Sequence, residues 1–96
     1  MKLSDLNLYP HPAGFQHRGE FENGFGVSVI PESDGVHFEV AVLSGEPGKN
    51  GTYHVCYTSG LTDDVFRYLT AEQVDEVIEK VRNLEPGTFV PAGWNQ

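Results

Sequence analysis

Four short segments between residues 15 and 58 alternate apolar and polar side chains, as strands do when they bury one face. Turn residues separate them: Asn23-Gly24 after the first, PESDG after the second and SGEPGKNG after the third. Short turns between alternating segments are typical of antiparallel hairpins. The pattern predicts a four-stranded antiparallel meander over residues 15–58.

The first turn also suggests a register. A three-residue loop with Gly24 in the left-handed conformation pairs Phe21 with Phe25. A two-residue loop would place these two rings on opposite faces, because side chains alternate along a strand. We therefore expect the three-residue loop.

The next two hairpins continue the same apolar face. We expect Val29 to pair with Val36, and Val42 with Tyr53. All three registers agree on one buried face, which supports the meander. The predicted face holds Phe15, Phe21, Phe25, Val27, Val29, Val36, Phe38, Val40, Val42, Tyr53, Val55 and Tyr57.

From residue 62 to 84 the pattern changes to helical spacing. Thr62 is suited to an N-cap, and Asp63 and Asp64 would follow in the first turn, where carboxylates favour the positive end of the helix dipole. These residues predict a short helix over DDVFRYL.

A second helix is predicted to begin at Ala71. Thr70 and Gln73 have capping-box spacing, and Pro86-Gly87 would end the helix. Its apolar residues fall on one stripe: Val74, Val77, Ile78, Val81 and Leu84.

The expected fold class is α+β, with the four-stranded meander packed on one face by two C-terminal helices. Residues 1–14 contain two prolines and Gly14 and are interpreted as an irregular lead-in. Residues 85–96 form a tail too short for a further element. The 96 residues make a single domain.

Composition narrows the function classes. Fourteen acidic and six basic residues give a net charge of −8, which disfavours direct binding to nucleic acid or to a membrane. The chain has a single cysteine, Cys56, and neither a signal-peptide pattern nor an apolar run long enough to span a bilayer. We expect a soluble cytoplasmic protein.

A zinc site on the polar face of the sheet is the sharpest metal hypothesis. His37, Glu39, His54 and Cys56 are ligand types that alternate onto that face. In the expected register the two histidines are diagonal and well separated, so the four side chains do not converge on one ion. We expect solvated histidines and no metal.

Catalytic groups are sparse. Cys56 would need a neighbouring base, such as His54, and a lowered pKa to act as a nucleophile, and a flat strand surface rarely forms the cleft for it. The G-x-G of NGFGVSV lacks a third glycine and a following helix, so it indicates a hairpin and not a phosphate site. We expect a non-enzymatic protein without a cofactor.

An acidic stripe lies opposite the apolar stripe of the second predicted helix. It consists of Glu72, Asp75, Glu76 and Glu79, preceded by Asp63 and Asp64. One interpretation is a solvated helix face with carboxylates that complement the dipole. The other is a surface that docks on a basic site of a partner protein.

The polar face of the sheet is a second candidate interface. Open sheets with mixed faces often pair with another copy, so a homodimer is the alternative hypothesis. The candidate self-association face comprises Arg18, Glu20, Ile30, His37, Glu39, Leu43 and His54.

Three runs of residues, NGFGVSV, FEVAVLSG and LTDDVFRYLTAEQVDEVIEKVRNL, carry a resemblance. In this order they resemble a family of small uncharacterised proteins of tailed phages and prophages, and the match covers roughly residues 20 to 84. The TDDVFRYLTAEQV run is the most specific. The resemblance implies a phage or prophage accessory protein that acts in the host bacterial cytoplasm. We expect it to bind a host protein, as an anti-defence inhibitor would.

Overall fold

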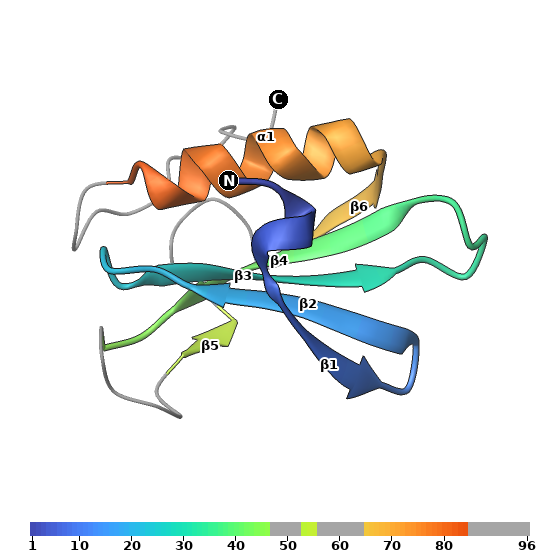
Figure 1. The fold of residues 1–96 in the computed structure, drawn as a ribbon, viewed down its shortest axis with the longest axis horizontal. Helices are drawn as coiled ribbons and strands as arrows, with labels where there is room; N and C mark the ends of the chain where they lie inside the picture. Colours follow the sequence, from blue (N-terminus) through green and yellow to red (C-terminus); the bar gives the residue numbers. More distant parts are fainter. Residues whose placement is uncertain (47–52, 56–64, 85–96) are drawn as a thin grey trace.

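The computed structural model describes residues 1–46, 53–55 and 65–84. Within these residues one layer is a six-stranded antiparallel sheet, and a single α-helix lies across one face of it (Figure 1). The elements are η1 (Leu3–Asp5), β1 (Asn7–His11), β2 (Gly14–Glu20), β3 (Phe25–Pro31), β4 (Phe38–Ser44), β5 (His54–Val55), β6 (Phe66–Leu69) and α1 (Ala71–Arg82). The expected α+β class is confirmed.

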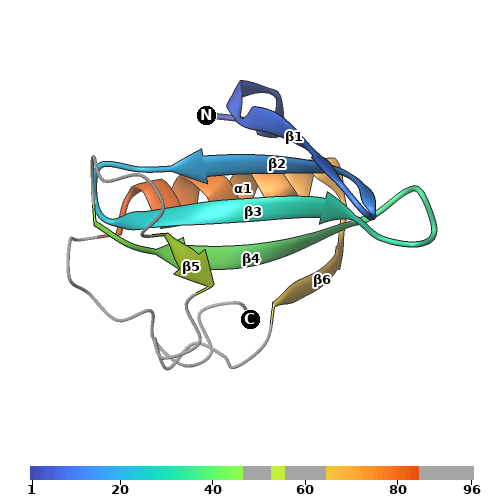
Figure 2. The same ribbon diagram turned by 90° about the horizontal axis from the view of Figure 1, so that it is seen from below.

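The strands follow the order β1-β2-β3-β4, and the outer edge of β4 carries two partners. β5 pairs with the end of β4 at Leu43 and Ser44, while β6 pairs with the start of β4 at Phe38 and Val40. Figure 2 shows these two short strands apart along the same edge. The prediction of four strands and two helices is therefore wrong in its details.

The first predicted hairpin is confirmed. The amide of Phe21 donates to the carbonyl of Phe25 at 2.8 Å, and Gly24 has a φ of 86°. Gly26 lies opposite Glu20, which continues the same register into the strands.

The second hairpin has a different register. Val29 pairs with Val40 and not with Val36, because residues 32–37 form a wider loop. Asp34 fixes that loop by accepting bonds from the amides of Val36 and His37, both at 2.9 Å. The shift is four residues, so the buried face keeps its alternation, but Val36 leaves the sheet and is 68% exposed.

The third hairpin is shifted by three residues, so that Val55 pairs with Leu43. An odd shift reverses the expected alternation of β5 against β4. Tyr53 explains the change, since its buried side chain donates a hydroxyl bond to the Phe21 carbonyl at 2.7 Å. This bond draws the start of β5 toward the β2–β3 turn. Tyr57 lies outside the described residues.

The short helix predicted for DDVFRYL is wrong over its second half. Phe66–Leu69 form β6, because the outer edge of β4 has unpaired backbone groups there and Phe66 and Leu69 pack against the core. Thr62, Asp63 and Asp64 lie outside the described residues.

The irregular lead-in predicted for residues 1–14 is also wrong. β1 pairs along its whole length with β2, and Leu6 is buried in the core. Gly19 makes room for Leu6, since a Cβ at Gly19 would lie only 2.7 Å from Leu6 Cδ2. Pro10 is tolerated because β1 is an edge strand.

The helix α1 begins as predicted. Gln73 donates its amide to Thr70 Oγ1 at 3.2 Å, and the Thr70 amide donates to Gln73 Oε1 at 2.9 Å. The predicted apolar stripe forms the core with the sheet, where Leu84 is partly buried and four residues are buried: Val74, Val77, Ile78 and Val81.

Candidate functional site

The acidic stripe of α1 is divided by the N-terminal segment. Asp75 accepts a bond from the amide of Leu3 at 2.8 Å, and Glu79 binds both the N-terminal ammonium of Met1 and the guanidinium of Arg82. The hydrogen bond from the ammonium is the main cause that lowers the pKa of Glu79. Half of the stripe therefore holds the chain's own N-terminal segment.

Glu72 and Glu76 remain exposed on α1. They are the part of the stripe that is open to a partner. Asp63 and Asp64, the two other acids of the predicted surface, lie outside the described residues.

An apolar surface lies beside this helix. α1 contacts β3, β4 and β6, and β1 lies to one side of the helix, at the far edge of β2 (Figure 2). On the helix side of β1 and β2 Leu8 lies opposite His17 and Pro10 opposite Phe15. Leu8 is 56% exposed and Phe15 is 58% exposed, although Phe15 was predicted to belong to the core. We call Leu8, Pro10, Phe15 and His17 the β1–β2 shelf.

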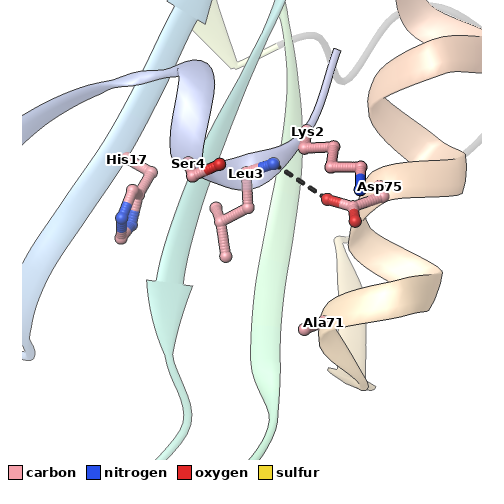
Figure 3. Close-up of a pocket in the computed structure, with 6 residues that line it drawn as sticks. All are labelled: Lys2, Leu3, Ser4, His17, Ala71 and Asp75. Carbon is pink, nitrogen blue, oxygen red and sulfur yellow. Dashed lines mark hydrogen bonds between the residues drawn. The ribbon is translucent and has the colours of Figure 1, made fainter.

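A pocket of about 270 Å³ connects the shelf to α1. Its lining residues come from the N-terminal segment, β2 and the first turns of α1: Lys2, Leu3, Ser4, His17, Ala71 and Asp75 (Figure 3). Figure 3 shows His17 on one side and the Leu3–Asp75 hydrogen bond on the other. A space of this volume is large enough for one amino-acid side chain.

The opposite, open face of the sheet is partly closed at one end. Arg18 donates to Glu20 Oε2 at 3.1 Å and to the carbonyl of Tyr53 at 2.9 Å. Leu43, expected on the candidate self-association face, is only 1% exposed. Burial raises the pKa of the Tyr53 hydroxyl, and the nearby charge of Glu20 adds to this. This end of the face is therefore occupied by the chain itself.

The rest of the candidate self-association face is dispersed. Ile30 is half-buried opposite Glu39, and His54 is exposed opposite Ser44. His37 and Glu39 belong to a separate group at the start of β4.

That group surrounds a buried carboxylate. The side chain of Glu32 is 6% exposed and receives two bonds from Arg67, at 2.8 Å from Nε and 3.0 Å from Nη2. These bonds are the main cause that lowers the pKa of Glu32. Arg67 Nε also lies 3.2 Å from Glu39. One guanidinium thus joins the end of β3, β4 and β6.

The neighbouring loop adds a carboxylate and an aromatic pair. Asp34 Oδ2 lies 2.6 Å from His37 Nδ1, and bonds from the His37 amide and ring lower the pKa of Asp34 to about 2. The ring of His37 meets the ring of Tyr68 edge-on, with centroids 6.3 Å apart. We call Glu32, Asp34, His37, Glu39, Arg67 and Tyr68 the β4–β6 corner.

The expected absence of a zinc site stays a prediction for Cys56, which lies outside the described residues. Within the described ranges no group of three or more His, Cys, Asp or Glu side chains is placed to hold a metal. His37 precedes β4 and His54 pairs with its last residue, so the two histidines lie at opposite ends of that strand.

Sequence patterns missed the shelf and Tyr68. Leu8 was assigned to the lead-in and Tyr68 to a helix. The β-branched and aromatic preference of strands was a signal for β6, since Phe66-Arg67-Tyr68-Leu69 has two aromatic residues among four. No sequence pattern indicated that Phe15 would be exposed, because its exposure depends on which strands α1 covers.

None of the helices in residues 1–46, 53–55 and 65–84 is long and apolar enough to cross a bilayer. Comparison with known proteins finds no matching family model and no significant match among curated proteins or solved structures.

Proposed function

We propose that this chain is a non-enzymatic binding protein that recognises a partner protein with a basic surface. The observation that carries the proposal is the exposed β1–β2 shelf, and Glu72 and Glu76 add two exposed carboxylates on α1, the helix whose Ala71 and Asp75 line the adjoining pocket. Leu8 and Phe15 are both more than half exposed, next to a pocket. Adjacent apolar side chains left in solvent mark interaction sites more often than single ones do.

The net charge of the chain indicates which class of partner would bind. A net charge of −8 favours encounter with a basic protein and opposes contact with phosphate backbones. The resemblance to phage and prophage proteins suggests that the partner is a host protein, and that binding inhibits it, as for an anti-defence protein. The shelf would bury an apolar side chain, and Glu72 and Glu76 would pair with flanking lysines or arginines.

Self-association through the open sheet face is the alternative. It has less surface available, because Leu43 is buried and Arg18 is bonded to Glu20 and Tyr53. Light scattering at micromolar concentration distinguishes the two, since a monomer excludes this alternative.

The test is an affinity capture from bacterial lysate followed by titration of the purified partner. The baits are the wild type, Phe15→Ser, and the double variant Glu72→Lys with Glu76→Lys. Asp75 and Glu79 are left intact because they hold the N-terminal segment. Glu22→Lys, a charge reversal in the exposed β2–β3 turn, is the control.

We expect one basic protein to be captured by the wild type and the control and lost with both surface variants. The purified partner should then bind in the same order. Equal capture by all four baits would refute the proposal.

A further inference from the structure

Tyr68 has an unusual backbone conformation. Its φ is 55°, and it is the single non-glycine residue with a positive φ in the described part of the chain. The cause is a β-bulge. Between the pairs Val40–Phe66 and Phe38–Leu69, β6 contains one residue more than β4. The additional residue is accommodated by left-handed backbone at Tyr68.

This conformation opposes folding. A non-glycine residue in the left-handed region costs about 1 to 2 kcal/mol, and bulky residues are rare there. At the bulge the backbone amide of Tyr68 donates to Glu32 Oε2 at 3.0 Å. A glycine would make the same bond without the strain.

The side chain of Tyr68 contributes little to the stability of the fold. The ring is 55% exposed, so it contributes little to the core. The ring lies 5.4 Å from the guanidinium carbon of Arg67, measured to the ring centroid, and meets the ring of His37 edge-on. An exposed cation–π contact is worth only about 0.5 to 1 kcal/mol. Folding therefore does not account for a tyrosine at this position, and strained residues of this kind occur at binding sites.

We propose that Tyr68 is a partner-contact residue whose ring receives a lysine or arginine side chain of the bound protein. The inference rests on the proposed function and adds a second contact point, at the β4–β6 corner. Arg67 and His37 contact the ring on the protein side, and tyrosine is one of the residue types enriched among those that dominate binding energy.

The charges around Tyr68 indicate which kind of side chain would bind on its ring. Around Tyr68 the corner has three carboxylates, on Glu32, Asp34 and Glu39, against the one guanidinium of Arg67. The excess negative charge suits a cationic side chain on the ring. A second copy of this chain, with its own charge of −8, would be repelled.

The test uses the full chain, labelled with ¹⁵N, and the peptide acetyl-Ala-Arg-Leu-Arg-Ala-amide, with acetyl-Ala-Glu-Leu-Glu-Ala-amide as the charge-reversed control. We expect the arginine peptide to shift the amide signals of Val36, His37 and Tyr68. Tyr68→Gly should weaken binding by about threefold to fivefold. Its melting temperature should be equal to or above that of the wild type, because the strain is removed.

Two further variants distinguish an effect of the aromatic ring on binding from an effect on folding. Tyr68→Phe keeps an aromatic face and should bind like the wild type. Tyr9→Ser removes another exposed tyrosine, in a regular strand, and should leave peptide binding unchanged.

Unchanged binding by Tyr68→Gly, or a clear loss of its thermal stability, would overturn the inference. Peptide shifts confined to Leu8, Phe15 and Glu72 would also overturn it while supporting the shelf as the binding surface. Failure of the shelf variants in the capture experiment bears on the proposed function alone.

Discussion

The side-chain amide of Asn23, in the turn between β2 and β3, donates to the carbonyl oxygen of Val81 in the last turn of α1 at 2.8 Å. The same nitrogen reaches the carbonyl of Leu84 at 2.9 Å, and the Asn23 oxygen accepts the amide of Phe25 at 3.0 Å. The last carbonyls of a helix have no partner within it. A turn residue therefore caps a helix 58 positions later in the sequence.

Asn23→Asp should destabilise the fold by about 1 to 2 kcal/mol. Aspartate keeps the oxygen that accepts the Phe25 amide, but it loses the donor to the helix and places a negative charge at the negative end of its dipole. Chemical denaturation measures the free energy of unfolding. Glu22→Gln, in the same turn, is the control, and equal stability of the two variants would contradict the capping role.

Thr70→Ala should remove the N-cap of α1 and cost about 1 kcal/mol, which lowers the melting temperature by about 4 to 8 °C in a domain of this size. Thr70→Ser retains the oxygen that accepts the Gln73 amide and should stay close to the wild type. Differential scanning calorimetry distinguishes them. A serine variant as unstable as the alanine variant would show that the methyl group, and not the cap, is what matters.

Acid should weaken the fold partly through Asp34. Its pKa falls from 3.8 to about 2 in the folded protein, so the unfolded chain binds the proton first as the pH is lowered. The stabilisation is present above about pH 4 and is lost between about pH 4 and 2. Asp34→Asn should melt below the wild type at pH 6, and the difference should shrink toward pH 2. A constant difference across that range would contradict this origin.

Two glycines should respond differently to alanine. A Cβ on Gly26 would overlap the carbonyl oxygen of Gly19 on the neighbouring strand, and backbone cannot move aside easily. Gly26→Ala should cost more than about 2 kcal/mol. A Cβ on Gly35 would meet no atom within 4 Å, so only its φ of 71° opposes the change, by about 1 to 2 kcal/mol. Denaturant titration of both variants tests this order, and the reverse order would contradict the described packing.

Local chemistry in the sequence was sufficient for several elements. Thr70 and Gln73 define the start of α1, because a capping box is completed by residues three apart. Gly24 allows the three-residue loop that pairs Phe21 with Phe25. The spacing of Val74, Val77, Ile78 and Val81 identifies the buried side of the helix.

Tertiary contacts decided the rest. Phe66–Leu69 form a strand because they pair with the outer edge of β4. The backbone groups of that edge need hydrogen-bond partners, and these can come from a segment far away in the sequence. Asp75 and Glu79 bind the N-terminal segment of the chain. Leu8 and Phe15 are exposed, because the contacts of α1 with the sheet lie mainly on β3, β4 and β6. Neighbours in the chain were enough to identify the buried side of the helix and the residue at which α1 begins, because both depend on residues three or four positions apart. Which acids and apolar side chains remain exposed depends on residues far apart in the sequence, and only packing brings those residues together.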